Sequence, residues 1–364
     1  METVDRRQVI GYRWRAHQLD GSGDGRIDLL DFGVQDTGVG GAGWALAARG
    51  GEPSELLMAW TLRGAPHAYR RADAAAVAVA TAPLSEADAA KRMFDASRPL
   101  RRAGIAALDA LRIVAEHERK IVSRPTVKGE LSSRLTATLD GPYLRWCRPC
   151  QATHCYEQPF RLAALQAGLE LEPGTSPPIL RRIPGFRPTP YAALGGAAQP
   201  RYHVVRNYLR FFGPARMRDA AAFLDSPVAD VKANWPSDAV EVAGPPGKGW
   251  YILADDLPAL TAAPEPAGTV RLVGPYDAYV QAKDRETLAP DAERRAELWP
   301  VLGRPGAVLR DGEIVGTWRP KTSGRTLSIT VNPWRDGVPT DALTTEAERF
   351  AEYRSLKLSS VAHA

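Results

Sequence analysis

Residues 202–256 contain the pattern that most restricts how this chain can fold. Three short segments with apolar residues at helical spacing follow one another there: YHVVRNYLRFFG, ARMRDAAAFLDS and VADVKANW. A proline follows each segment closely, which is a helix stop signal. The β-rich segments AVEVAG and GWYILA then flank the turn PPGK, which indicates a hairpin. Three short helices followed by a β-hairpin is the order of a winged helix, a variant of the helix-turn-helix.

The same order of elements occurs twice more, less completely. IAALDALRIVAEHERKIV and TVKGELSSRLTATL predict two helices, and YLRWCRPCQATHCYEQPFRLAAL predicts wing-like strands and a further helix. Near the N-terminus, RRQVIGYRWRAHQL predicts a helix and ELLMAWTLRGAPHAYRR predicts strands. Residues 173–200 are dense in proline and glycine and are expected to connect modules. We therefore expect winged-helix-like modules over 1–104 and 105–180, and a linker with a third module over 181–264.

Beyond residue 268 the pattern becomes all β. The segments GTVRLVGPYDAYV, GAVLRDGEIVGTWRPK and RTLSITVNPW alternate in the manner of strands, and Asp311-Gly312 is a strong hairpin signal. An amphipathic helix, TTEAERFAEYRSL, follows them. Residues 265–364 are thus expected to form a small antiparallel β-barrel and a C-terminal helix. The predicted fold class is α+β: tandem winged-helix domains followed by a small C-terminal antiparallel β-barrel.

Composition restricts the class of protein. With 44% hydrophobic and 24% charged residues the chain is ordinary globular protein. No apolar run approaches the length of a membrane span, and the N-terminus lacks the apolar core of a secretory signal. We expect a cytoplasmic protein, a monomer in preference to an oligomer, with no membrane partner. No P-loop, HExxH, Rossmann or GxSxG motif stands in a suitable context, which argues against the corresponding nucleotide and hydrolase chemistries.

Positive charge is concentrated in the middle of the chain. Residues 111–216 carry 16 Lys and Arg against 7 Asp and Glu, whereas residues 217–364 carry 17 against 21. Most of the surplus is arginine, whose guanidinium fork suits phosphate oxygens. A polyanion, and double-stranded DNA in particular, is the partner this distribution favours. The alternative is that arginine is simply the common basic residue of an Ala-, Arg-, Gly- and Pro-rich sequence.

Gln35, Asp36 and Thr37 stand at a predicted junction between a strand and a helix. The apolar run Leu29–Val34 predicts the strand, a glycine-rich turn follows, and residues 44–49 are helical in pattern. Because strand side chains alternate, Gln35 and Thr37 would share one side and Asp36 the other. The residues are candidates for a site that lines a cleft. The alternative is that Asp36 or Thr37 only caps the helix.

Arg63 and His67 lie four residues apart around a Gly-Ala-Pro turn, and both could face the same channel. They could hold a phosphate or an extruded base. The alternative is that His67 bonds a neighbouring backbone carbonyl while Arg63 is solvated.

Three cysteines and a histidine, Cys147-x2-Cys150-x3-His154-Cys155, resemble a metal knuckle. Tetrahedral zinc needs four ligands, but adjacent strand residues point apart, so only one of His154 and Cys155 could face the metal. Three ligands at most are available. Buried thiols that pack a wing are the favoured interpretation, so no cofactor is expected and a structural zinc ion held by Cys147, Cys150 and His154 is the alternative.

The chain resembles the AlkZ/YcaQ-type DNA glycosylase superfamily, whose members carry tandem winged-helix domains and a C-terminal β-barrel. The resemblance lies in GVQDT with ALAAR, LRGAPH with the following Asp73, CRPCQATHCYEQPFRLAALQAGLEL, LVGPYDAYVQAKDR and VLRDGEIVGTW. These segments are spread over nearly the whole chain in the order found in the family. The resemblance implies DNA as the partner, damaged or alkylated, with phosphates contacted by Arg63, His67, Arg124, Lys128, Arg134, Arg145 and Arg148.

In that family a Gln-x-Gln or Gln-x-Asp motif lines the DNA channel and is implicated in base excision. Gln35 matches its first position, and Thr37 occupies the second. The resemblance implies a monofunctional glycosylase for bulky or alkylated bases, in which Gln35 orients water or the sugar and Asp36 and Thr37 assist. Because Thr37 departs from the motif, a non-catalytic DNA-binding protein, either a regulator or a self-resistance factor, is the alternative.

Overall fold

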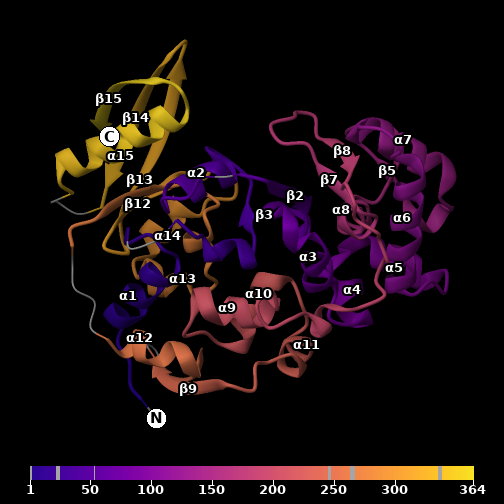
Figure 1. Cartoon of the computed structure of the whole chain (residues 1–364), viewed down its shortest axis with the longest axis horizontal. Coiled ribbons are helices and arrows are strands. Elements are labelled where there is room, and N and C mark those ends of the chain that lie inside the picture. Colours follow the sequence, from indigo (N-terminus) through magenta and orange to yellow (C-terminus); the bar gives the residue numbers. More distant parts are fainter. Residues whose placement is uncertain (1, 22–24, 53, 245–246, 263–266, 335–337) are drawn as a thin grey trace.

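The computed structural model describes residues 2–21, 25–52, 54–244, 247–262, 267–334 and 338–364. Helices and strands are mixed along the chain, in agreement with the predicted α+β class. The N-terminal segment lies between the C-terminal sheet and a helical lobe formed by residues near 100–140 (Figure 1). No described helix has the length and apolarity needed to cross a membrane.

The first part of the chain forms a small sheet and several helices. Its strands pair antiparallel in the order β1-β3-β2. The predicted strand over residues 29–34 is wrong except at its end, because Asp28–Asp31 forms a 3₁₀ turn that buries Leu29 and Leu30. Helices α3 to α5 were not predicted, since α3 is apolar on all sides and has no amphipathic period. The elements are α1 (Arg6–Ala16), β1 (Val34–Gln35), α2 (Gly41–Ala47), β2 (Leu56–Trp60), β3 (Pro66–Arg70), α3 (Ala74–Thr81), α4 (Glu86–Arg92) and α5 (Ser97–Arg102).

The second part has the predicted helices and hairpin, together with a second small sheet. That sheet has the order β4-β8-β7, and β8 lies inside the proline-rich segment that we expected to be only a connection. Glu170 of β7 is buried and pairs with both Arg71 and Arg181, which ties this sheet to the first one. The elements are α6 (Ala107–Ile121), β4 (Thr126–Val127), α7 (Lys128–Thr138), β5 (Leu144–Cys147), β6 (Ala152–Cys155), α8 (Glu157–Gln166), β7 (Leu169–Leu171) and β8 (Ile179–Arg182).

The third part has the predicted order of three helices and a hairpin. An aromatic face of α9 packs Tyr208 and Phe212 against Phe223 of α10, and Phe32 stacks on Phe211 and Phe223. Pro245 and Pro246 of the predicted turn lie outside the described residues. The elements are α9 (Val204–Phe212), α10 (Met217–Leu224), α11 (Val228–Ala233), β9 (Ala239–Gly244), β10 (Gly247–Leu253) and α12 (Leu257–Thr261).

The C-terminal part is an open sheet rather than the predicted barrel. The order is β11-β12-β13-β14-β15, and the outer strands β11 and β15 do not pair with each other among the described residues. The last pair, β14 and β15, is parallel because α15 carries the chain back to the same end of the sheet. The elements are β11 (Val270–Val273), α13 (Arg285–Leu288), α14 (Ala292–Leu298), β12 (Gly306–Arg310), β13 (Glu313–Ser323), β14 (Thr326–Pro333), α15 (Thr340–Tyr353) and β15 (Lys357–His363).

The all-β prediction beyond residue 268 is also wrong, because α13 and α14 interrupt the strands. The side chain of Asp291 accepts the backbone N–H groups of Glu293 and Arg294 and thereby caps the start of α14. The predicted Asp311-Gly312 hairpin is confirmed, and both residues have positive φ. The predicted last helix is also confirmed.

Two buried ion pairs fasten the loop between β11 and α13 to the N-terminal part. Arg49 donates two hydrogen bonds of 2.8 Å to the carboxylate of Asp277. Arg13 of α1 pairs with Asp284 at 2.8 Å. All four side chains are nearly inaccessible to solvent. Since isolated buried charges are costly, these pairs fix residues 277–284 against α1 and the segment that follows α2.

Candidate functional site

Gln35 stands at the end of β1, where the chain leaves the first sheet. It pairs in register with His67 of β3, and its Nε2 donates a hydrogen bond of 3.2 Å to Oγ1 of Thr37. Gln35 and Thr37 therefore share one side, as strand alternation predicts. Gln35 is mostly buried, and both residues line the same cleft.

Arg63 holds the other end of the Gln35 amide. One guanidinium nitrogen donates to Oε1 of Gln35 over 3.0 Å and to Oε1 of Gln281 over 2.7 Å. The guanidinium also covers the ring of Phe223 at 4.3 Å and donates to its carbonyl. Burial lowers the pKa of Arg63, and the carboxylate of Asp225 acts in the opposite direction. Gln35 is thus clamped on both sides, with its oxygen toward Arg63 and its nitrogen toward Thr37.

The backbone of Arg63 is in the left-handed region, with φ of 57°. An arginine in this conformation costs about 1–3 kcal/mol, which neighbouring interactions must offset. Such strain is concentrated at functional positions. The solvated Arg63 that we considered as an alternative is not what the structure shows.

Asp36 serves as a helix cap and also lines the cleft. Its Oδ1 accepts the N–H of Ala42, in the first turn of α2, over 2.8 Å. A Cβ at Gly41 would lie 2.1 Å from this oxygen, so only glycine fits there. The capping role that the sequence suggested is therefore present. Alternation does not remove Asp36 from the site, because β1 ends at Gln35 and the chain turns.

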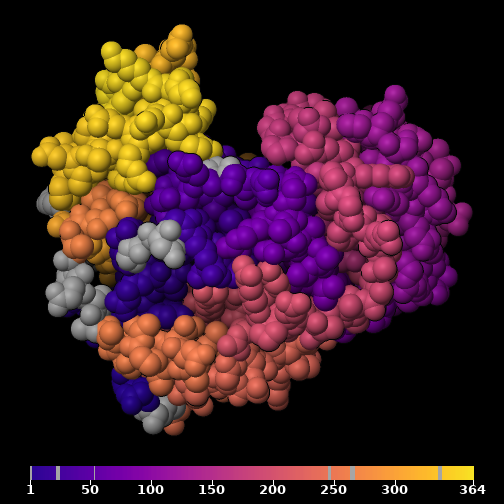
Figure 2. All heavy atoms as spheres, in the orientation of Figure 1, coloured from indigo at the N-terminus to yellow at the C-terminus, as the bar shows by residue number. Residues whose placement is uncertain are grey.

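Two clefts meet at Gln35 and Arg63. The larger has a volume of about 610 Å³ and includes Lys128 and Arg161 in its wall. The smaller has a volume of about 170 Å³ and carries three further cations, Lys283, Arg285 and Arg304. Figure 2 shows the molecule hollowed between the C-terminal sheet, in yellow, and the lobe in purple and pink, with the indigo N-terminal segment below. The Gln35 amide therefore lies where two cation-lined hollows join.

The cations of the larger cleft share one acidic partner. Lys128 and Arg161 both pair with Glu157, at 2.7 and 2.6 Å, and they lower its pKa although burial acts to raise it. Arg161 also covers the ring of Trp60 at 5.4 Å. Two positive charges thus face one negative charge.

The cations of the smaller cleft are held mainly by aromatic rings. Arg285 lies over Trp299 at 4.9 Å and Arg304 over Tyr276 at 5.3 Å. Burial lowers the pKa of Lys283, and the nearby charge of Arg63 lowers it further. Among the residues the structure describes, Asp36 is the only acid in the walls of the two clefts. The cations of the two clefts outnumber the acids beside them, and such an excess of positive charge attracts an anion.

Sequence reasoning missed Arg161, Lys283, Arg285 and Arg304. The signal for the last three was weak, since they belong to a segment whose total charge is negative. Lys283, Arg285 and Arg304 follow Gln35 by more than 240 residues, so only the fold brings these three cations to it.

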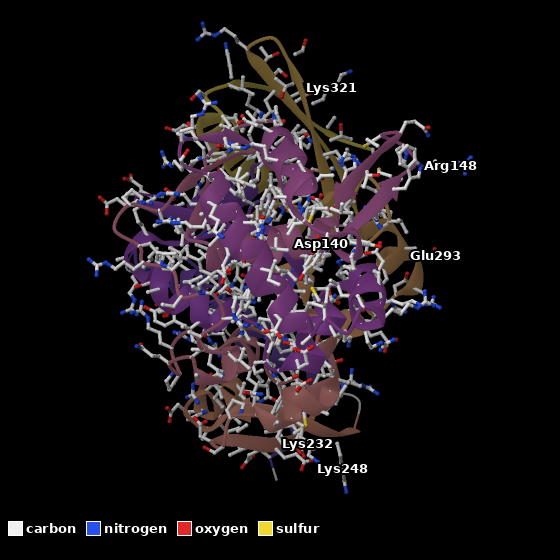
Figure 3. The ribbon with its side chains drawn as sticks, turned by 90° about the vertical axis from the view of Figure 1, so that its right-hand side faces the viewer. Asp140, Arg148, Lys232, Lys248, Glu293 and Lys321 are labelled. Carbon is white, nitrogen blue, oxygen red and sulfur yellow. The ribbon has the colours of Figure 1, made fainter. Side chains whose placement is uncertain are left out.

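The predicted phosphate-binding residues separate into two groups. Arg63 and Lys128 lie in the clefts with Gln35. The other arginines lie outside them: Arg124 and Arg134 near Glu130, Arg145 paired with Asp95 at 3.0 Å, and Arg148 at an exposed hairpin end. Figure 3 shows Arg148 and Lys321 on hairpins that project from the body of the molecule.

His67 does not reach the cleft. Its ring is 2% exposed, and Nδ1 lies 3.0 Å from Oγ1 of Thr61 and 2.9 Å from the carbonyl oxygen of Ala65. Burial lowers the pKa of His67 to about 3, and the charge of Arg63 acts in the same direction. A neutral, buried imidazole cannot contact a phosphate, so the structure favours the alternative role of bonding the turn that presents Arg63.

Cys147, Cys150 and His154 converge on one side of the β5–β6 hairpin. One ligand atom from each residue lies within 4.8 Å of the others. The backbone N–H of Cys150 bonds the Cys147 sulfur and lowers the pKa of that thiol. Cys155 points the other way, where burial raises its pKa to about 12. Only Cys155 is thus the buried thiol that we expected of all three cysteines.

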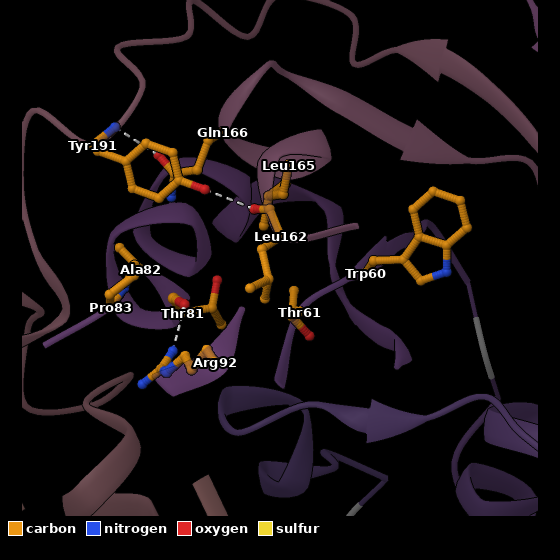
Figure 4. Close-up of a pocket in the computed structure, with 10 residues that line it drawn as sticks. All are labelled: Trp60, Thr61, Thr81, Ala82, Pro83, Arg92, Leu162, Leu165, Gln166 and Tyr191. Carbon is orange, nitrogen blue, oxygen red and sulfur yellow. Dashed lines mark hydrogen bonds between the residues drawn. The ribbon is translucent and has the colours of Figure 1, made fainter. Parts of the chain in front are cut away.

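A further cavity lies where β2, α3 and α8 meet, and Figure 4 shows it in close-up. Its walls are bonded to one another: Tyr191 donates to the carbonyl of Leu162, and Arg92 to the carbonyl of Thr81. Its volume of about 10 Å³ holds one water molecule at most. We therefore exclude this cavity as a ligand site.

A family model described as "DNA glycosylase AlkZ-like" matches residues 42–353. That span begins just after Gln35, Asp36 and Thr37. Among solved structures, the Streptomyces sahachiroi DNA glycosylase AlkZ is similar over 100% of both chains, with a TM-score of 0.73 and 18% sequence identity. At that identity the likeness shows the fold alone. No curated protein matches the sequence.

Proposed function

The chain belongs to the AlkZ-like family of DNA glycosylases, and we propose that it is a monofunctional enzyme that excises bulky or alkylated bases from double-stranded DNA. The observation that carries this proposal is the position of the Gln35 amide. It is clamped by Arg63 and Thr37 at the point where two cation-lined clefts join. An amide fixed in this way costs no reorganisation when the reaction occurs.

The clamp leaves the amide with unused hydrogen-bonding capacity. Oε1 of Gln35 has a second lone pair besides the one that Arg63 occupies, and Nε2 has a second hydrogen. We assign the free lone pair to a water molecule beside the sugar. The amide thereby orients the nucleophile, while Arg63 and Thr37 act as positioning residues.

The reaction is hydrolysis of the bond between C1′ of the sugar and the base. Water adds to C1′ as that bond breaks, and the electron pair leaves with the base. In an N7-alkylated guanine this pair neutralises the charge of the ring, so the leaving group needs no proton. Positive charge grows on the sugar, and Asp36 supplies the carboxylate that stabilises it and accepts the proton of water.

The basic clefts explain how the DNA would be held. Lys128 and Arg161 on one side, and Lys283, Arg285 and Arg304 on the other, contact phosphates around the extruded nucleotide. The arginines outside the clefts, Arg124, Arg134, Arg145 and Arg148, reach phosphates farther along the duplex. An alkylated base unstacks more easily than a normal one, which contributes to selectivity.

We extend the proposal to the organisation of the chain. Residues 1–104, 105–180 and 181–264 act as three winged-helix-like modules that present the clefts to DNA, and residues 265–364 add the open sheet. The observed order α9, α10, α11, β9, β10 supports this for the third module. We propose that the protein works as a monomer in the cytoplasm.

Release of free base from duplex DNA that carries N7-methylguanine tests the proposal. We expect the wild-type chain to release base and the Gln35→Ala variant to be at least about 100-fold slower, because the water loses its acceptor. Asp36→Asn should be slowed as well. If wild type releases no more base than Gln35→Ala on several adducts, the enzymatic proposal fails.

A non-catalytic DNA-binding protein, a regulator or a self-resistance factor, is the second candidate. The observation that favours it is that Thr37 accepts a bond from Gln35 and Asp36 accepts one from Ala42, so neither is unengaged. DNA affinity that falls steeply with salt, without base release, would support this candidate. Absence of DNA binding at low salt contradicts both.

A further inference from the structure

The β5–β6 hairpin places two metal-binding residue types on one face. Arg145 pairs with His154, and Cys147 pairs with Ala152. In an antiparallel pair, directly opposed side chains point to the same face, and so do residues two apart along a strand. Cys147 and His154 are therefore diagonal neighbours on one face of the hairpin. Trp146 and Cys155 belong to the opposite face.

The turn of the hairpin brings back a third ligand. Residues 148–151 link the strands, and Cys150 lies among them, with its N–H bonded to the Cys147 sulfur. The turn brings both sulfurs close to His154. The three ligand atoms then lie within 4.8 Å of one another. Ligands on a tetrahedral zinc ion, at about 2.3 Å for sulfur and 2.0 Å for nitrogen, are roughly 3.5 Å apart. The ligand atoms need to move only about 1 Å, by rotation of their side chains, to reach the spacing of a zinc site.

A second observation points to a ligand at this place. Nε2 of His154 is buried, and among the described residues it has no hydrogen-bond partner. A buried ring nitrogen without a partner costs free energy unless something binds it. A metal ion on the same face satisfies this requirement, since neutral imidazole is a common zinc ligand.

We propose that Cys147, Cys150 and His154 bind one zinc ion, with water or an added ligand in the fourth position. Two thiolates balance the charge of the ion. Thiolates are soft ligands, and together with one imidazole they favour zinc over magnesium or calcium, which prefer oxygen ligands.

The ion would link the turn of the hairpin, through Cys150, to both strands, through Cys147 and His154. A two-stranded hairpin is only marginally stable by itself, so a cross-link at its end restricts its movement. The hairpin carries Arg148 at its end and Trp146, which is 61% exposed, on the face away from the metal. The metal would thus fix the orientation of the hairpin, and with it the direction in which Trp146 and Arg148 project into solvent.

The test is metal content and cobalt binding of the full-length chain. Protein purified with reductant and without chelator should contain about one zinc per chain. After removal of zinc, one equivalent of Co²⁺ should give the sulfur-to-metal absorption band and the visible bands of a tetrahedral site. Cys147→Ser, Cys150→Ser and His154→Ala should each weaken binding of the metal by about 100-fold or more.

Cys155→Ser is the matched control, because Cys155 neighbours His154 in sequence but faces the core. It should retain both the zinc and the cobalt spectrum. Zinc below about 0.2 per chain, together with cobalt binding no tighter than in Cys147→Ser, overturns the proposal. A disulfide between Cys147 and Cys150 in protein kept under reductant overturns it as well. These measurements do not depend on base excision, so their outcome is separate from that of the proposed enzymatic function.

Discussion

The guanidinium of Arg63 bonds the amide oxygen of Gln35 at 3.0 Å and so fixes which end of that amide faces Thr37. The same guanidinium nitrogen reaches Gln281, which belongs to the loop held by the buried pair of Arg49 and Asp277. Gln35 is therefore positioned by Arg63 directly and, through Arg63, by the distant loop that carries Gln281.

Replacement of Arg63 by methionine should slow base release without preventing DNA binding. The Gln35 amide then loses the bond that orients it, and misplacement of a reacting group by about 1 Å costs on the order of 100-fold in rate. Single-turnover release and DNA affinity, measured separately, check this. Arg92→Met is the matched control, because it breaks a buried pair with Asp88 away from the clefts and should lower stability alone. Equal rates in the two variants would contradict a positioning role for Arg63.

The hydroxyl of Thr37 should matter more than its shape. Thr37→Val keeps the branched side chain but removes the acceptor for Nε2 of Gln35, so we expect single-turnover release about 10-fold slower with unchanged DNA affinity. Thr37→Ser keeps the hydroxyl and should retain the wild-type rate within about two-fold. If valine and serine behave alike, Thr37 does not position Gln35.

Removal of a cation from the smaller cleft should make DNA binding less dependent on salt. Lys283→Ala and Arg285→Ala should each reduce the slope of log K against log salt by about 1, as expected for the loss of one phosphate contact. Arg112→Ala is the control, since Arg112 pairs with Asp109 on an exposed face of α6 outside both clefts. The same slope in all three variants would mean that the smaller cleft does not hold a phosphate.

Local signals in the sequence predicted much of the fold. The three helices and hairpin of residues 204–253 follow from apolar periodicity and prolines, which act over a few residues. The parallel pairing of β15 with β14 depends on where α15 returns the chain, and no local pattern contains that information. The predicted barrel was therefore wrong although four of its strands were found.

The candidate site was predictable only in part, for the same reason. The family motif pointed to Gln35, and the Gly-Ala-Pro turn pointed to Arg63. The cation cluster arises because Asp277 and Asp284 pair with Arg49 and Arg13, which are far away in sequence. The sequence left two roles open for His67, because its burial depends on the packing of β3 between β1 and β2.

Two buried histidines should make the protein less stable in mild acid. Burial lowers the pKa of both His17 and His67 to about 3, aided by Arg49 and Arg63 respectively. An unfolded histidine titrates near 6.5, so between pH 6.5 and 3 the unfolded chain binds more protons than the folded one. The free energy of unfolding should thus have its full value above pH 6.5. Below pH 6.5 it should fall by up to about 1.4 kcal/mol per pH unit for each histidine. Urea unfolding at pH 7, 6 and 5 measures this.

The variant His67→Gln separates the two histidines. It keeps a side chain that can bond Thr61 but cannot take up a proton, so the loss of stability between pH 6.5 and 5 should be about half that of wild type. An unchanged dependence on pH would show that His67 does not stay neutral in the folded chain. Base release by this variant should have the wild-type pH profile, because His67 lies outside the cleft.

The buried pair of Asp277 and Arg49 should contribute both to the stability of the protein and to the position of the loop that lines the smaller cleft. Burial raises the pKa of Asp277, but Arg49 and the N–H of Tyr279 more than offset this and leave the pKa below its ordinary value. Asp277→Asn leaves the Arg49 charge buried without a counter-ion, which should cost about 3–5 kcal/mol of unfolding free energy.

The same substitution should loosen the loop that carries Gln281 and Lys283. We therefore expect Asp277→Asn to weaken DNA binding and slow base release at temperatures where the variant is still fully folded. Asp88→Asn, which breaks the buried pair with Arg92, is the control for lost stability without an effect on the cleft. If Asp277→Asn lowers the unfolding temperature but leaves binding and release unchanged, the loop is not held in place by this pair. Because Arg63 bonds Gln281 as well as Gln35, movement of this loop should also displace the side-chain amide of Gln35.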